Sequence, residues 1–113
     1  MPDDCIFCKI AAKQIPVEPI WEDEEFIAFR DLTPQAPIHA LVIPKAHFAT
    51  ILEMDDEGLM GRILKAVQQT AKALNLTEEG FRTVINCREN GGQTVYHLHI
   101  HLLGGRFMQW PPG

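Results

Sequence analysis

The stretch Tyr96-His-Leu-His-Ile-His-Leu-Leu103 places a histidine at every second position, each followed by a large aliphatic residue. A β-strand sends successive side chains to opposite faces, so the spacing predicts His97, His99 and His101 on one face of a sheet. The aliphatic residues between them then face the other way and require burial. In a helix the same histidines would be spread around the axis and would share no surface. The pattern therefore predicts a strand over residues 95–103 that carries three imidazoles side by side.

Three interpretations of this histidine row are open. The histidines can be strand residues that face water, although the aliphatic residues between them argue against this. Two of them can bind zinc as neutral imidazoles, because an H-x-H pair on a strand can converge on one metal ion. Alternatively, one acts as a nucleophile and another as its acid or orienting partner, because an imidazole with a pKa near ~6.5 is partly neutral at neutral pH.

The composition bounds both the fold and the partners. The 113 residues are 46% hydrophobic and 22% charged, which is typical of a globular protein and predicts a single domain over residues 1–113. A formal charge of -5 offers no broad cationic surface, so neither nucleic acid nor membrane is an expected partner. No apolar run approaches the roughly 20 residues of a membrane span, and Met1-Pro2-Asp3-Asp4 lacks the basic start of a signal peptide. Three cysteines, two of them in a C-x-x-C, favour a reducing, cytoplasmic environment.

The rest of the chain combines strand patterns with two helical ones. A short helix is predicted over residues 4–13, with Asp4 as its N-cap and Pro16 ending it. A long amphipathic helix is predicted over residues 55–74, where apolar residues recur at spacings of four and three. Further strands are predicted over residues 18–21, 25–30, 38–43 and 81–87. The turn signal Asn90-Gly91 predicts that the last of these pairs antiparallel with the histidine strand.

The histidine stretch resembles the signature H-φ-H-φ-H-φ-φ, with φ apolar, of the histidine triad (HIT) superfamily of nucleotidyl hydrolases and transferases. The resemblance extends to Asp31-x-x-Pro-x-Ala-Pro-x-His39, Leu41-Val-Ile-Pro-Lys45, Gly91-Gly-Gln-x-Val-Tyr96, Leu103-Gly-Gly105 and Trp110-Pro-Pro-Gly113. These segments look like the Hint branch, the histidine triad nucleotide-binding proteins that act as purine nucleoside phosphoramidases, and they cover nearly the whole chain. The resemblance implies an α+β HIT-like fold in which an antiparallel sheet, with one long and one short helix, continues across a homodimer.

The resemblance also implies the chemistry. His99 would attack the α-phosphorus of a purine nucleoside phosphoramidate and form a nucleotidyl-histidine intermediate, which water then hydrolyses to the monophosphate. His101 would contact the phosphate and assist the leaving group, while His39 and His97 would orient His99. A phosphoramidate nitrogen leaves poorly until it is protonated, so a neighbouring imidazolium is useful in the first step and a neutral imidazole in the second.

Substrate contacts follow from the same resemblance. Asp31 would accept hydrogen bonds from both ribose hydroxyls, which suits a carboxylate, although an aspartate that opens a loop is also common. The phosphate would be held by Asn86, Gly92, Gln93 and Thr94, because the amides of a glycine turn can approach an anion closely. The purine base would lie in an apolar pocket, although as a bare pattern these residues also fit a core: Ile6, Phe7, Ile10, Phe29 and Leu32.

Three further positions bear on specificity. Thr94 stands where the Hint branch often has serine, and Arg30 stands where it often has histidine, so these positions bear on the leaving-group and ribose-edge contacts. In similar proteins the C-terminus reaches the partner's active site, which implies that Trp110 shapes the leaving-group side of a substrate site in the homodimer.

Cys5-Ile-Phe-Cys8 is a second candidate centre. By itself the pair is compatible with buried helix thiols or a redox pair, and two cysteines cannot complete a structural zinc site. Superfamily members that keep this C-x-x-C complete the site with histidines matching His47 and His97. The resemblance thus implies a structural zinc that fixes the first helix to the sheet, while catalysis needs no cofactor. Cys87, in a predicted strand, is expected in the core.

Rival functions remain open at this stage. A dinucleoside polyphosphate hydrolase of the fragile-histidine-triad branch is the nearest, and the segments 91–96 and 110–113 argue against it. A nucleotide-binding scaffold or regulatory protein would keep the pocket and act through partners. A zinc hydrolase built on the triad would lose its activity on chelation. The leaving group and the choice between adenine and guanine do not follow from the sequence.

Overall fold

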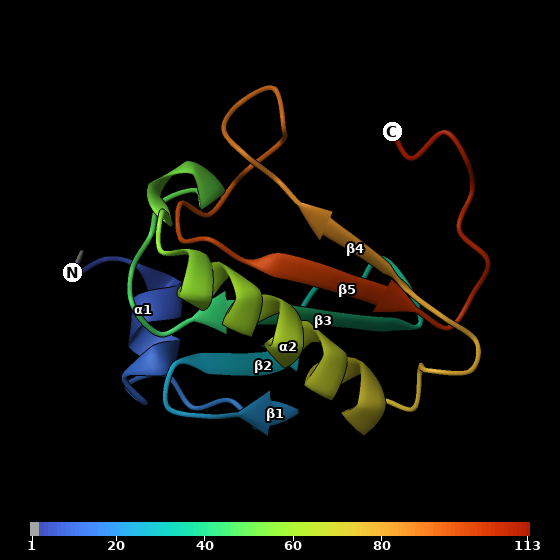
Figure 1. The fold of residues 1–113 in the computed structure, drawn as a ribbon, viewed down its shortest axis with the longest axis horizontal. Coiled ribbons are helices and arrows are strands. Elements are labelled where there is room, and N and C mark those ends of the chain that lie inside the picture. The colour runs from blue at the N-terminus through green and yellow to red at the C-terminus, as the bar shows by residue number, and fades with distance from the viewer. Residues whose placement is uncertain (1–2) are drawn as a thin grey trace.

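The computed structural model describes residues 3–113; Met1 and Pro2, which begin the N-terminal stretch considered above, lie outside the described residues. The elements are α1 (Ile6–Ala11), β1 (Trp21–Glu22), β2 (Phe26–Arg30), β3 (Ile38–Pro44), the 3-10 turn η1 (Ile51–Glu53), α2 (Glu57–Ala73), β4 (Arg82–Ile85) and β5 (Ile100–Gly104). Their five strands form one antiparallel sheet in the order β1-β2-β3-β5-β4 (Figure 1). The predicted α+β class, with one long and one short helix, is confirmed.

Alternating side chains give the sheet two apolar faces. Helix α2 covers one face, where it packs on buried residues of β2, β3 and β5 such as Phe26, Val42 and Leu102 (Figure 1). On the opposite face a smaller cluster joins α1 to the sheet and consists of Phe7, Ile10, Ile27, Phe29, Leu41 and Ile43. His101 precedes Leu102 in β5, so its side chain lies on the α1 face. The candidate chemistry is therefore separated from α2 by the sheet.

Both helices end in the same way, at a residue with a positive φ. Lys13 has φ 64°, and the amides of residues 13 and 14 bond back to Ile10 and Lys9, which completes a Schellman motif. Asn75, with φ 59°, ends α2 with the equivalent pair of bonds. The first helix is thus shorter than predicted, and its N-cap is Cys5 instead of Asp4.

Among the described residues, no helix combines the length and apolarity that a membrane crossing requires.

Strand β5 begins later than the histidine pattern predicts. It pairs antiparallel with β4 as expected, but residues 95–99 lie outside the ladder. The amide of Leu98 instead donates to the carbonyl oxygen of Phe48 at 2.6 Å, a residue in the loop that follows β3. Alternation persists, since Leu98 is buried with the α2 cluster while the rings of His97 and His99 both pack against Phe7. The predicted facing of the histidines is correct, and a long loop over residues 86–99 replaces the tight hairpin.

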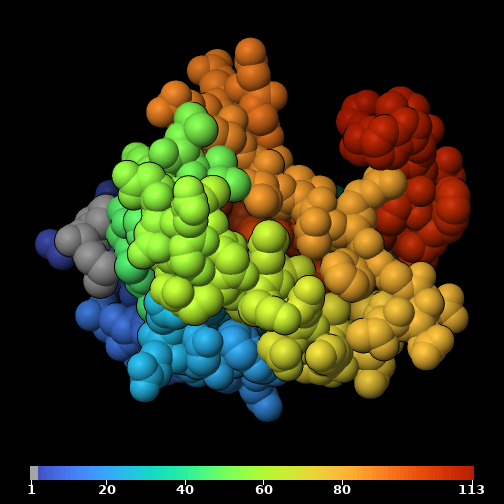
Figure 2. Space-filling view, in the orientation of Figure 1, coloured from blue at the N-terminus to red at the C-terminus, as the bar shows by residue number. Residues whose placement is uncertain are grey.

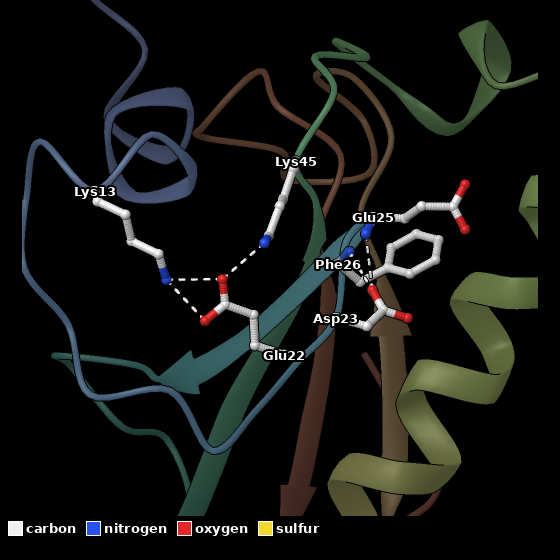
Figure 3. A network of polar contacts seen from close by, with 6 residues as sticks. All are labelled: Lys13, Glu22, Asp23, Glu25, Phe26 and Lys45. Atoms are coloured by element: carbon white, nitrogen blue, oxygen red, sulfur yellow. Dashed lines mark hydrogen bonds and ion pairs between the residues drawn. The ribbon is translucent and has the colours of Figure 1, made fainter.

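A polar network fastens the end of α1 to the corner between β1 and β2 (Figure 3). The carboxylate of Glu22 lies 2.7 Å from the Nζ atoms of both Lys13 and Lys45. Hydrogen bonds from Lys13 and then Lys45 lower the pKa of Glu22. Asp23 turns the chain, because its Oδ1 accepts two main-chain amides of the following residues at 2.8 Å each. Strand β1 is shorter than predicted and starts at Trp21.

Candidate functional site

His99 is held in one tautomer by the main chain. Its Nδ1 lies 2.7 Å from the carbonyl oxygen of His97. A carbonyl can only accept, so Nδ1 carries the proton and the Nε2 lone pair is free. The ring is only 7% exposed and meets the edge of Phe7 at a centroid distance of 5.1 Å. The interpretation of this histidine as a strand residue that faces water is therefore wrong, because α1 packs over this face of the sheet.

His101 and His39 form a hydrogen-bonded pair beside His99. Nδ1 of His101 is 2.9 Å from Nε2 of His39, and Nδ1 of His39 accepts the main-chain amide of Gln35 at 3.0 Å. The rings of His99 and His101 are 5.0 Å apart. Burial lowers the pKa of His101 to about 4, with the neighbouring His99 and His39 adding to the effect and Asp31 opposing it. His101 is thus neutral near pH 7.

Asp31 serves the loop and the histidine pair together. Its Oδ1 accepts the amide of Thr33 at 2.8 Å and the hydroxyl at 3.1 Å, which is the loop-opening role that is common for aspartate. Its Oδ2 lies 3.5 Å from Nε2 of His39. The carboxylate predicted to bind ribose is therefore next to the histidine network, with one oxygen already engaged.

Cys5, the N-cap of α1, and Cys8 within α1 lie next to His47 and His97, as the resemblance implies. Nδ1 of His97 lies 3.3 Å from Sγ of Cys5 and 3.5 Å from Sγ of Cys8. Nδ1 of His47 lies 3.3 Å from Sγ of Cys8 and 3.2 Å from Nδ1 of His97. In tetrahedral zinc, bonds of about 2.3 Å to sulfur and 2.0–2.1 Å to nitrogen separate such ligand atoms by roughly 3.3–3.6 Å. The four side chains fit one zinc ion.

The surroundings of His97 also suit a metal ligand. Its Nε2 lies 2.8 Å from the carbonyl oxygen of Pro44, which places the proton there and directs the Nδ1 lone pair at the cysteines. Such a second bond commonly orients metal-binding histidines. Burial lowers the pKa of His97 to about 4, against the effect of the Pro44 carbonyl. Burial and then the neighbouring Cys5 raise the pKa of the Cys8 thiol to about 11. A dication offsets this cost by stabilising the thiolate.

The predicted phosphate loop has its polar groups engaged within the protein. The Gln93 amide group is fully bonded: Oε1 accepts the amide of Arg88, and Nε2 donates to the carbonyl oxygens of Ala49 and Val95. The main-chain amides of Gly92 and Gln93 donate inside the loop, and the Asn86 side chain donates to the carbonyl oxygen of Gly91 at 2.7 Å. The side chain of Gln93 thus connects the loop, through hydrogen bonds, to the segment after His47.

Glycine is required at position 91 because a Cβ there would lie 2.5 Å from the carbonyl oxygen of Cys87. Thr94 is exposed and lines a pocket of about 500 Å³ together with Ile6, Cys5 and His47. The threonine proposed for the leaving-group side therefore lies close to the cysteine cluster. Cys87 is partly exposed, and the expectation of a core cysteine is wrong.

The five apolar residues expected around a base do not line one cavity. Phe7, Ile10 and Phe29 are buried in the α1 cluster. A pocket of about 540 Å³ is lined by Phe29, Arg30 and Leu32, together with residues 16–20 and the end of α2. Leu32 is 93% exposed there, whereas Ile6 belongs to the Thr94 pocket and is 44% exposed.

The C-terminal segment follows β5 and projects beside the edge strand β4 (Figure 1). The guanidinium of Arg82 in β4 lies 5.9 Å from the centre of the Trp110 ring, which is 78% exposed. A hollow of about 340 Å³ is bordered by Met108, Gln109, Pro111 and Pro112 together with Gln35 and Val84. Trp110 is therefore not in contact with His99 of its own chain.

Sequence reasoning missed the main-chain groups that organise the histidines. The amide of Gln35 and the carbonyls of Pro44 and His97 set the proton positions of three imidazoles. Nothing in the side-chain pattern identifies them. Gln35 lies between two prolines at positions 34 and 37, and this was the available indication of a fixed loop.

Comparison with known proteins agrees with this geometry. The HIT domain family model matches residues 12–108. The chain is 53% identical, over the full length of both, to an uncharacterised HIT-like protein of Synechococcus elongatus. It is 48% identical to protein HitA of Neisseria gonorrhoeae, over 90% of this chain and 96% of that protein. The crystal structure of a HIT family hydrolase from Legionella pneumophila superposes with a TM-score of 0.92 at 52% identity, covering 97% of this chain and all of that one. The chain belongs to the HIT domain family.

Proposed function

We propose that the protein is a purine nucleoside phosphoramidase, which cleaves the P–N bond of AMP-amine compounds and releases the nucleoside monophosphate. The observation that carries the proposal is the His99 ring, whose Nδ1–H is bound by the His97 carbonyl so that the Nε2 lone pair is available. A structural relative with a TM-score of 0.92 is described as a hydrolase, which supports hydrolysis as the reaction class.

The proposed reaction has two displacements at phosphorus. Nε2 of His99 attacks the α-phosphorus, the P–N bond breaks, and the nitrogen takes up a proton and departs as an amine. Water then attacks the same phosphorus, the P–Nε2 bond breaks, and the monophosphate leaves with His99 restored. His101 contacts the phosphoryl group and assists departure, and His39 and His97 keep the two working rings in place. No cofactor takes part in either displacement.

Substrate contacts are proposed at the positions matched above. Asp31 binds the ribose through its Oδ2, since Oδ1 is engaged by Thr33. Thr94 lies on the leaving-group side, and the residues 86–93 form the phosphate side with Gln93 as an internal brace. The purine base is proposed to lie in the pocket of about 540 Å³ against Phe29, Arg30 and Leu32, because a base can stack on apolar and guanidinium surfaces.

Zinc is proposed as a structural ion held by Cys5, Cys8, His47 and His97. A zinc site there crosslinks α1 to the loop after β3 and to the histidine segment. The protein is also proposed to work in the cytoplasm, where the thiols of Cys5, Cys8 and Cys87 stay reduced.

A homodimer is proposed across the edge strand β4. Within residues 3–113 this strand has a neighbour on one side only, and the loop 86–99 and the C-terminal segment project on either side of it (Figures 1 and 2). Ile85 of β4 and Met60 and Leu64 of α2 are exposed and line a wholly apolar pocket of about 150 Å³. An unpaired edge beside apolar side chains is suited to pairing with a second copy.

The proposal is tested by supplying adenosine 5'-phosphoramidate and a diadenosine polyphosphate to the same preparation, before and after exhaustive chelation. Faster turnover of the phosphoramidate that survives chelation is the expected result. Preference for the polyphosphate would instead identify a dinucleoside polyphosphate hydrolase. Loss of activity on chelation would identify a zinc hydrolase, and nucleotide binding without turnover a scaffold.

A further inference from the structure

The hydrogen-bond chain that ends at His101 begins at a main-chain amide. The N–H of Gln35 points at Nδ1 of His39 at 3.0 Å. An amide nitrogen only donates, so Nδ1 of His39 must keep its lone pair. The ring proton of neutral His39 is therefore on Nε2, the atom that faces His101 at 2.9 Å.

This assignment determines the next ring in turn. Because Nε2–H of His39 donates, Nδ1 of His101 accepts, and the proton of neutral His101 lies on its Nε2. The opposite arrangement would place the hydrogen of His39 on Nδ1, directly against the hydrogen of the Gln35 amide. One backbone amide thus orders the protons of two imidazoles.

We infer that the Gln35 amide, acting through His39, fixes His101 as a neutral hydrogen-bond donor that presents Nε2–H to the substrate and does not transfer that proton. For His101 to be an acid it must gain a proton on Nδ1, which already faces the Nε2–H of His39. If the proton of His39 moved from Nε2 to Nδ1 to make room, it would point at the N–H of the Gln35 amide. The hydrogen bond between His39 and His101 opposes the first change, and the hydrogen bond from the Gln35 amide to His39 opposes the second.

The charged and titratable groups around His101 agree with this inference. His99 precedes it in the chain, His39 faces it from β3, and Val84 lies opposite it in β4. Asp31 is the anion that favours the charged form; its Oδ2 lies 3.5 Å from Nε2 of His39, and its carboxylate is within 4.8 Å of the nearest ring nitrogens of both histidines. Burial in this setting lowers the pKa of His101 to about 4.

The loop that contains the Gln35 amide is held in place by the segment that follows β5. Nη2 of Arg106 donates to the carbonyl oxygen of Gln35 at 3.1 Å. A Cβ at Gly105 would lie 2.9 Å from Cβ of Pro37, so the backbone after β5 packs closely on the loop. These contacts keep the amide directed at His39.

The inference rests on the proposed phosphoramidase reaction and specifies its proton source. The nitrogen is protonated by solvent before cleavage, and the substrate reacts in that N-protonated form. Nε2 of His99 forms the new P–N bond while the scissile P–N electron pair returns to the protonated nitrogen, which leaves as a neutral amine. His101 donates a hydrogen bond to a phosphoryl oxygen throughout and keeps its proton.

The kinetic test compares His101→Gln, whose amide N–H can occupy the place of Nε2–H, with His101→Ala, over amines of increasing basicity. A neutral donor predicts that His101→Ala loses about 10²–10³ in kcat. For His101→Gln it predicts a loss within about tenfold, and for both variants a loss independent of the amine. An acid predicts equal losses in both variants that grow with amine basicity, and this result would overturn the inference.

The spectroscopic test does not depend on turnover. ¹⁵N NMR of the imidazoles, with and without AMP at pH 7, should show His39 and His101 protonated on Nε2 alone. Gln35→Ala, which keeps the amide, should preserve that state, whereas Gln35→Pro, which removes it, should give mixed tautomers. An imidazolium signal for His101 with AMP bound, or an Nδ1–H in free protein, contradicts the inference. If the protein turns over no phosphoramidate, the proposed function fails while the tautomers are still decided.

Discussion

The ring of His97 faces the cysteine cluster while its carbonyl oxygen accepts Nδ1–H of His99 at 2.7 Å. One residue therefore belongs to both centres, through different atoms. The ring supplies a metal ligand, and the main chain orients the proposed nucleophile. This division suggests which changes affect each centre alone.

Replacing His99 tests the nucleophile. We expect His99→Gln to lower turnover by about 10⁴-fold or more, because the substitution removes the Nε2 lone pair that attacks phosphorus in the proposed reaction. Glutamine is preferred to alanine since the ring is buried against Phe7, and alanine would leave a cavity. Acid quench of the natural protein with substrate should trap an adduct on His99. Tyr96→Phe, at an exposed neighbouring position, is the control that should retain turnover, and an adduct on another residue would refute the mechanism.

Removing a cysteine tests the zinc site. Cys5→Ser or Cys8→Ser should lose the one zinc per chain expected in gently purified protein, with a lower Tm because α1 loses its crosslink. Turnover should fall little, since the main-chain bond to His99 remains. Metal analysis and thermal unfolding provide the measurement. Cys87→Ser, outside the cluster, should keep both zinc and Tm. A parallel fall of zinc content and turnover would show that the metal also positions the nucleophile.

Acid should destabilise the protein through His101. Its pKa is about 4 in the folded protein against 6.5 for a free histidine, so between these values the unfolded chain binds more protons. Stability therefore falls as the pH drops from 6.5 towards 4, by up to about 1.4 kcal/mol per pH unit from this group. Denaturant unfolding across that range should show a shallower dependence in His101→Gln than in the natural protein. Identical slopes would mean that His101 is not held neutral.

Glu22 should add to the loss of stability in acid, at the corner that joins the end of α1 to the sheet. Its pKa is lowered by Lys13 and Lys45, so its contribution is present above pH 4.5 and is lost as the carboxylate is protonated below it. Because the pairs are at the surface, we expect Glu22→Gln to cost about 0.5–1 kcal/mol near pH 7, measured by denaturant unfolding. Glu25→Gln, which breaks a single exposed pair with Arg62, is the control and should cost less.

Deleting residues 109–113 tests the role of Trp110 in a dimer. Trp110 lies over Arg82 of its own chain and is 78% exposed, so most of the ring is accessible to a partner subunit. AMP binding should stay nearly unchanged, while turnover of bulky phosphoramidates should change more than that of the unsubstituted compound. Sedimentation should give a dimer, which Ile85→Lys at the β4 edge should dissociate. A monomer, or equal effects on all substrates, would refute this assignment.

The side-chain pattern predicted the antiparallel pairing of the segments 81–87 and 95–103, and it did not predict the order of the strands in the sheet. Alternation gave the correct face for His97, His99 and His101, because burial of the intervening aliphatic residues enforces it. It did not predict that residues 95–99 leave the ladder, since the partner of Leu98 is the carbonyl of Phe48, distant in sequence. The four zinc-site residues came from family resemblance. The internal role of Gln93 required coordinates, because a glutamine can equally bind substrate or its own loop.

The dependence of these imidazoles on main-chain groups limits how the site can be transplanted. A designer who copies H-x-H-x-H onto another strand transfers the rings without the carbonyl of Pro44 or the amide of Gln35, which come from segments remote in sequence. In such a graft the imidazoles would be mixtures of the two neutral tautomers, with pKa values near that of a free histidine. A unit that keeps these contacts must therefore include the loop 31–37 and the end of β3. The smallest segment that could be transferred with the histidines oriented is close to the whole sheet.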